Sequence, residues 1–152
     1  MKKLLLIFLA IVLSACSAFQ PKSDLDRAQD KWQDANISHY RFNLSIGCFC
    51  VFRGEMPLAI EVKDGQVVSI QHQDGSPVDA ANLEYFQRYA TIEKIFAEIR
   101  NGFKGEAEKE ADKVTVEYDE TYGFPKQVSV DFIEQAVDDE LGLTIDKFEA
   151  LP

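Results

Sequence analysis

Hydrophobic and polar residues change their spacing several times along the chain, and each change marks an expected element. After a polar N-cap at Ser23, apolar residues follow a helical stripe as far as Ala35. From Ser38 the spacing becomes two, with apolar residues facing one side from Tyr40 to Cys50. This predicts a long half-buried strand that includes the last two cysteines. Similar alternation predicts strands near residues 58–62, 68–72, 114–118, 128–132 and 141–145.

Turn and cap signals separate these elements. Asp64-Gly65 predicts a tight hairpin, because both residues tolerate the positive φ that such a turn needs. Thr91 is expected to cap a second helix that stops at Asn101-Gly102. Residues 74–77 are of the types that favour a turn, and the stretch from there to residue 90 has no clear spacing of hydrophobic residues. The sequence thus predicts a helix, three strands, a helix and three strands.

This order is typical of an α+β fold. We expect an antiparallel sheet with helices on one face, in the order αβββ-αβββ, as if the same plan were used twice. The chain has 152 residues, a length that suits one domain. We expect that domain over residues 24–152.

Residues 1–15 have the features of a secretory leader. Two lysines are followed by an apolar run that is too short to span a membrane. Leu13-Ser14-Ala15-Cys16 resembles the bacterial lipobox, and the resemblance implies that Cys16 carries acyl groups, palmitate among them, in the mature chain. Residues 16–23 would then be a tether to the membrane. A plain signal peptide with a chance cysteine is the alternative.

Location and partners follow from the leader and from the charge. Ser17 after the cysteine, by resemblance to Gram-negative lipoproteins, favours an outer-membrane anchor that faces the periplasm. The formal net charge of −10 argues against nucleic acid as a partner and against a polybasic contact with anionic lipid. We therefore expect membrane contact through the lipid on Cys16 and an envelope protein as the partner.

Cys48 and Cys50 are the remaining cysteines once Cys16 carries lipid. Their Cα atoms would lie about 6.5 Å apart in an extended strand, near the upper limit for a disulfide. A local disulfide at a strand end is our main interpretation. The alternatives are a redox-active pair, or two thiolates that bind zinc or copper(I) together with His72. We expect His72 to be a structural histidine, and we predict no cofactor and no metal.

Several motifs occur in a distinctive order from about Trp32 to Phe148. Together they resemble a family of bacterial lipoproteins and secreted domains that is known only as a domain of unknown function. The resemblance implies a small extracytoplasmic domain and no particular activity. The motifs are Tyr40-x-Phe42 with Cys48-Phe49-Cys50, Ile60-Glu61-Val62-x-Asp64-Gly65-x-Val67, Tyr118-Asp119-x-x-x-Gly123-Phe124-Pro125 and Asp138-Asp139-Glu140.

The stretch from Tyr118 to Pro125 is interpreted as a structural turn. Asp119 can accept backbone N–H groups, Gly123 can take positive φ, and Pro125 can end the loop. A catalytic Asp119 is the alternative. The sequence has no Gly-x-Ser-x-Gly, no phosphate loop and no dinucleotide-binding motif, so we expect a non-catalytic protein.

The predicted function is a binding or structural module of the envelope. Its expected contact surface combines an aromatic stretch with an acidic turn, since aromatic residues on irregular segments are enriched where partners bind. The alternative is that the aromatic residues fill the core. Other functions left open are metal or redox handling by the cysteine pair and inhibition of an envelope enzyme. The contact residues are Tyr85, Phe86, Tyr89, Asp138, Asp139 and Glu140.

Overall fold

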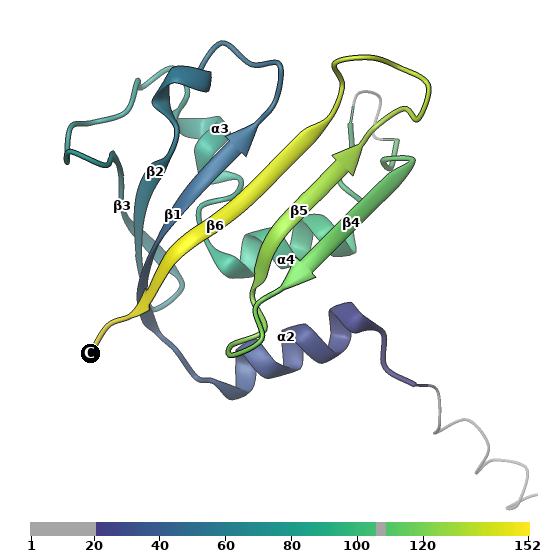
Figure 1. Cartoon of the computed structure of the whole chain (residues 1–152). Helices are drawn as coiled ribbons and strands as arrows, with labels where there is room; N and C mark the ends of the chain where they lie inside the picture. The colour runs from purple at the N-terminus through teal and green to yellow at the C-terminus, as the bar shows by residue number, and fades with distance from the viewer. Residues whose placement is uncertain (1–20, 106–108) are drawn as a thin grey trace, which may run out of the picture.

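A single six-stranded sheet dominates the computed structural model, which describes residues 21–105 and 109–152 (Figure 1). The strand order is β3-β2-β1-β6-β5-β4, and each neighbouring pair is antiparallel. The strands are β1 (His39–Gly47), β2 (Leu58–Lys63), β3 (Gln66–His72), β4 (Lys113–Tyr118), β5 (Pro125–Asp131) and β6 (Leu141–Ala150).

Helices cover the sheet from behind and below in Figure 1. They are α2 (Asp24–Asp34), α3 (Leu83–Gln87) and α4 (Ile92–Arg100), together with a 3-10 turn, η2 (Arg53–Glu55). Both predicted caps form: Ser23 Oγ accepts a hydrogen bond from Asp26 N at 3.1 Å, and Thr91 Oγ1 accepts one from Lys94 N at 3.2 Å. These bonds satisfy N–H groups that lack a partner within the first helical turn.

The predicted order αβββ-αβββ is wrong, and the fold is dominated by its sheet. A 3-10 turn stands between β1 and β2, and two helices rather than one stand between β3 and β4. The halves also run in opposite directions: the first begins at the centre of the sheet with β1, whereas the second begins at an edge with β4. A repeated plan would put β1 and β4 in equivalent places, so the second half does not copy the first.

The core lies between the sheet and the helices. Alternate side chains of β1 from Tyr40 to Ile46 are buried against Ile92, Ile95 and Phe96 of α4 and their neighbours. Trp32 of α2 packs edge-on against Tyr40, with ring centroids 5.3 Å apart. The opposite face of the sheet is polar, which is the pattern of an antiparallel sheet covered on one side.

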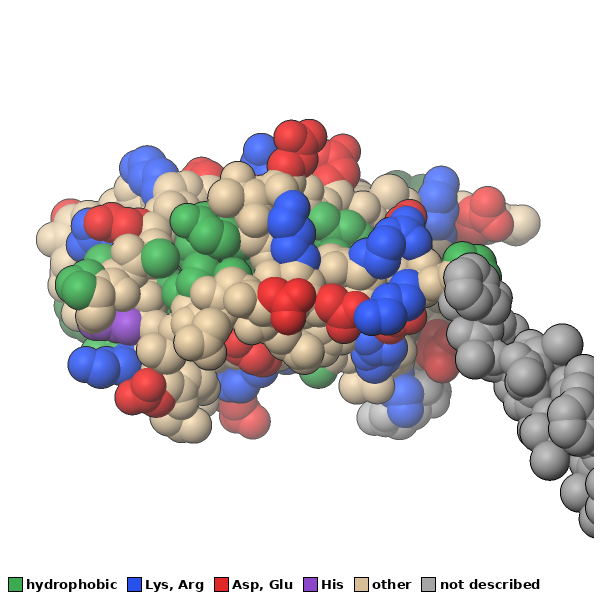
Figure 2. All heavy atoms as spheres, turned by 90° about the horizontal axis from the view of Figure 1, so that it is seen from below, with side chains coloured by type: hydrophobic (Ala, Val, Ile, Leu, Met, Phe, Trp, Pro, Cys, Tyr) green, Lys and Arg blue, Asp and Glu red, His purple; other side chains and the backbone are tan. Residues whose placement is uncertain are grey.

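The end of the molecule that carries α2 is charged, and several of its charges are paired. Acidic and basic side chains are interspersed there (Figure 2). Arg100 pairs with Asp26 at 2.9 Å, and Lys22 pairs with Asp30. Among the residues that the structure describes, no helix is long and apolar enough to cross a membrane. The predicted leader and Cys16 lie outside the described residues.

Candidate functional site

Two loops meet at the upper end of the sheet in Figure 1, and we call this region the loop end. One loop, residues 48–57, follows β1, and the other, residues 132–140, precedes β6. Because β1 and β6 are neighbours and Gly47 pairs with Gly142, the first loop begins beside the point where the second loop ends. The loop end is opposite the end beneath which α2 lies, so it points away from the start of the described chain.

A cleft of about 450 Å³ opens between these loops and the α3 segment. Its volume is in the range of small-ligand and peptide side-chain sites. A second hollow of about 450 Å³ lies next to it and shares Gly105, Phe132 and Asp139. Both together are called the loop-end cleft below. The predicted contact and disulfide residues that line it are Cys48, Cys50, Tyr85, Tyr89, Asp138, Asp139 and Glu140.

The aromatic part of the predicted surface is largely buried. Phe86 and Tyr89 are 0% and 1% exposed, so the expectation of a free aromatic surface is wrong for these two residues. They pack because α3 turns its apolar side under the loop end, where Phe52 lies 4.9 Å from the Tyr85 ring and 5.1 Å from the Phe86 ring. Burial raises the pKa of the Tyr89 phenol. Tyr85, which is only partly buried, remains at the cleft wall.

The loops around the cleft carry exposed apolar side chains, which we call its rim and which no sequence pattern indicated; of these, Phe49 and Ile133 line the cleft itself. Four of them stand on the two loops: Phe49 is 80% exposed, Val51 99%, Ile133 53% and Val137 83%. Large apolar side chains grouped at one end of a molecule mark an interaction surface more often than scattered ones do. Their exposure had no signal in the sequence, because Val51 stands next to Phe52 and Ile133 next to Phe132, as buried apolar residues also do.

The charged groups of the cleft are of two kinds. Arg88 is held by Glu98, with Nε to Oε1 at 2.9 Å and Nη2 to Oε2 at 2.6 Å, and this pairing raises the pKa of the guanidinium. The carboxylate of Asp139 is not paired in this way. Both of its carboxylate oxygens are buried, and neither has a hydrogen-bond partner among the described residues.

The cysteines form the disulfide that the sequence suggested, but not within a strand. β1 ends at Gly47, and Cys48 and Cys50 lie in the bend that follows, with Cα atoms 5.2 Å apart. The separation is shorter than the extended 6.5 Å because the chain turns here. With the sulfurs bonded to each other, neither is a thiolate ligand. His72 lies against Glu55 instead, with Nδ1 3.2 Å from the Glu55 carbonyl oxygen.

The turn from Tyr118 to Pro125 lies at the other end of the molecule, next to α2. Asp119 Oδ1 accepts hydrogen bonds from Thr121 N at 2.9 Å and Tyr122 N at 2.7 Å. Gly123 has φ +82°. A Cβ at this position would stand 2.4 Å from the Ala28 carbonyl oxygen, so the glycine lets the turn touch α2. The contact with α2 gives these residues a packing role.

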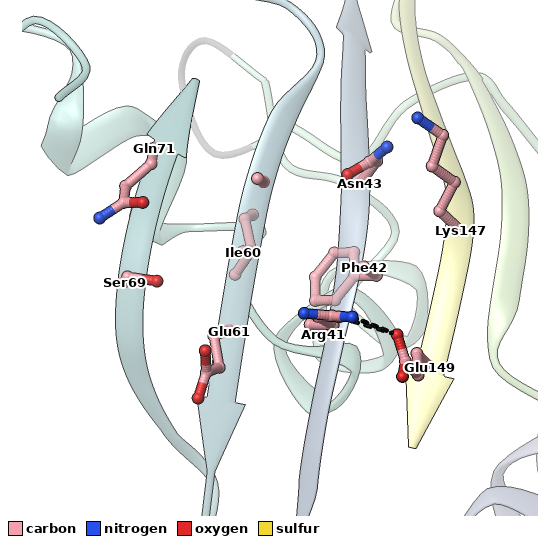
Figure 3. A pocket seen from close by; sticks show the side chains of 10 residues that line it. Arg41, Phe42, Asn43, Ile60, Glu61, Ser69, Gln71, Lys147 and Glu149 are labelled. Atoms are coloured by element: carbon pink, nitrogen blue, oxygen red, sulfur yellow. Dashed lines mark hydrogen bonds and ion pairs between the residues drawn. The ribbon is translucent and has the colours of Figure 1, made fainter. Parts of the chain in front are cut away.

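A separate hollow, which no sequence motif indicated, lies on the polar face of the sheet (Figure 3). It measures about 380 Å³ and lies over small residues such as Ala59 and Ser69. Arg41 is bound to Glu149 through Nε at 2.8 Å and Nη2 at 2.6 Å. Lys147 reaches this face from a bulge in β6, where its φ is +48°. Most charges here are neutralised by neighbours, so the hollow ranks behind the loop-end cleft as a site.

Comparison with known proteins identifies the family of the chain. A model for a family of unknown function, DUF6174, matches residues 24–150. The chain belongs to this family. No curated protein and no solved structure matches it. The family match agrees with the resemblance found in the sequence, in the coarse sense of a domain without an assigned activity.

Proposed function

We propose that this DUF6174 chain is a lipid-anchored lipoprotein of the cell envelope that binds a partner protein, without catalysis, through the loop-end cleft. The leader over residues 1–15 and the lipobox at Cys16 support the anchor. Ser17 supports an outer-membrane position facing the periplasm. The acidic net charge supports a protein partner over nucleic acid.

One observation carries the binding role. Three segments that are distant in the sequence, the disulfide loop, α3 and the acidic turn, converge on one cleft whose rim is apolar and exposed. Exposing four large apolar side chains at one end costs solubility, and burial against a partner removes that cost. The loops that line the cleft also lie at the end of the sheet opposite α2, which follows the tether, so an anchored protein would present them to the periplasm (Figure 1).

The anchor is tested by metabolic labelling with a palmitate analogue in cells that express the full chain. We expect label on the wild type and none on Cys16→Ser, which should also leave the membrane fraction. A Cys48→Ser/Cys50→Ser double variant is the matched control, because it replaces the other two cysteines and should keep the label. Equal labelling of Cys16→Ser and the wild type would refute the anchor.

The binding surface is tested by a photo-crosslinking amino acid placed at Phe49 or Val137 in intact cells. Val68 is the matched control, because it is also apolar and 57% exposed but stands on the edge strand β3. We expect a discrete adduct from Phe49 and from Val137, and its loss when Ile133→Glu adds a charge to the rim. No adduct from the loop end, or the same adduct from Val68, would contradict the proposal.

A further inference from the structure

Asp139 has an unusual environment for a carboxylate. Its two oxygens are buried and find no hydrogen-bond partner among the described residues, while its neighbours Asp138 and Glu140 are exposed. Withdrawing a charged group from water without hydrogen bonds costs free energy, and folded chains seldom leave such a group unpaired. A counter-ion supplied by a ligand would remove this cost.

The basic side chains around the cleft are already engaged. Arg88 is bound to Glu98 by two hydrogen bonds, and Lys109 pairs with Asp112 at 2.9 Å. Lys104 likewise is not free. The cleft therefore retains an excess of negative charge at Asp139 and its two acidic neighbours, and charge complementarity favours a positively charged ligand group.

The walls next to Asp139 are apolar. Phe132 lines both hollows, Phe49 lines the one between the loops and α3, and Ile133 lines the one next to it. A bare cation would leave these side chains in water. A Lys or Arg side chain combines a cationic head with an aliphatic stem, so it can pack along Phe132 and still reach a carboxylate.

We propose that the loop-end cleft binds a segment of an envelope protein in which a Lys or Arg stands among apolar residues, with the cationic head paired to Asp139. This inference rests on the proposed function and names the chemistry of the partner. Asp139 lines both hollows of the cleft, so its side chain is within reach of a ligand bound there. A protein segment is favoured over a small amine because Val51 and Val137 are exposed but do not line the cleft, so a small ligand would leave them uncovered.

The test selects a random peptide library on the full mature chain, with Asp139→Asn and Asp138→Asn in parallel. Asp138→Asn is the matched control: it removes the same charge one residue away, from an exposed side chain whose φ of +69° Asn also tolerates. Asp139→Asn should be at least as heat-stable as the wild type, because it removes a buried unpaired charge. Lost binding would then not reflect unfolding.

We expect the wild type and Asp138→Asn to select peptides with a Lys or Arg beside apolar residues. The selected peptides should bind Asp139→Asn at least about 10-fold more weakly, and norleucine in place of the Lys should cause a similar loss. Equal binding by Asp138→Asn and Asp139→Asn, selection of peptides without a basic residue, or no selection at all would overturn the proposal. Full displacement of the peptides by butylamine would also overturn it, in favour of a small-molecule ligand.

The crosslink from Val137 separates this inference from the proposed function. If the adduct forms in the wild type and persists undiminished in Asp139→Asn, the partner surface stands and the cation site is refuted. If the wild type forms no adduct at the loop end, the proposed function itself fails. A loss of the adduct in Asp139→Asn with retention in Asp138→Asn supports both.

Discussion

Trp32 Nε1 donates a hydrogen bond to Glu93 Oε1 at 2.9 Å, and this bond joins α2 to the first turn of α4. The other oxygen, Oε2, accepts a hydrogen bond from the Tyr40 hydroxyl at 3.1 Å. That hydroxyl in turn accepts one from Ile92 N at 3.1 Å. One carboxylate thus connects two helices to the central strand β1, at the end of the molecule that lies opposite the loop end.

Replacement of this carboxylate should destabilise the fold. Glu93→Ala leaves two partly buried donors without an acceptor, and we expect a loss of about 1–3 kcal/mol in the free energy of unfolding. Glu93→Gln retains one carbonyl acceptor and should lose less. Urea denaturation measures both. Glu84→Ala, an exposed position in α3, is the control, and a loss there as large as at Glu93 would contradict the role of the bond.

Gly123 is predicted to be the least replaceable glycine of the chain's turns. In Gly123→Ala the new Cβ meets the Ala28 carbonyl oxygen at 2.4 Å, and the residue must also hold φ at +82°. Gly75→Ala is a matched control, because Gly75 has φ +84° and nothing within 4 Å of its Cβ position. We expect about 1–2 kcal/mol of destabilisation at Gly75 from backbone conformation alone, and clearly more at Gly123. Thermal denaturation measures both variants. Equal destabilisation by Gly123→Ala and Gly75→Ala would contradict the prediction, because it would mean that α2 shifts to admit the new Cβ at no cost.

The disulfide should contribute little to stability. It closes a very small loop, so its removal in a Cys48→Ser/Cys50→Ser variant should cost no more than about 2 kcal/mol. The crosslink from Phe49 should fall more clearly, because the bond holds this exposed side chain at the cleft. Chemical denaturation and crosslink yield are the two measurements. A loss above about 4 kcal/mol would instead make the disulfide a main support of the fold.

His39 should give the stability a small pH dependence. Its hydrogen bond to Glu61, with Nε2 2.9 Å from Oε1, and the carbonyl of Pro152 raise the pKa of the imidazole above its ordinary 6.5. The protonated form is therefore favoured by folding. Its contribution is complete below the ordinary pKa and is lost as pH rises through the raised one. Compared with Glu61→Gln, the wild type should thus have a larger advantage in melting temperature at pH 5.5 than at pH 8.5. A histidine pKa unchanged by Glu61→Gln in NMR titration would contradict this.

Long-range pairing decided several features that local patterns left open. The strand predicted near residues 68–72 begins at Gln66, and a register shift between Glu61 and Val62 pairs Val62 with Val67. Val68 is consequently 57% exposed. The order of the strands could not be predicted from the sequence either, because the β1–β6 pairing at the centre of the sheet joins residues about a hundred positions apart.

Part of the loop-end cleft could be predicted from the sequence and part could not. Disulfide, aromatic and acidic residues were singled out by their chemistry, and the structure brings most of them to one cleft. The exposed rim and the unpaired state of Asp139 were not predictable. Exposure and hydrogen-bond satisfaction depend on what packs next to a side chain, and those neighbours come from other loops.

The sequence by itself determined the elements whose causes are local: the helix caps at Ser23 and Thr91, the Asp64-Gly65 hairpin and the Cys48–Cys50 pair. These depend on side chains reaching a few residues along the backbone. Only the tertiary structure decided the strand order, the end of β1 at Gly47 and the meeting of the two loops beside Gly142. The physical reason is that burial of the apolar face of the sheet and its pairing across distant strands are properties of the whole fold, which no short stretch of sequence contains.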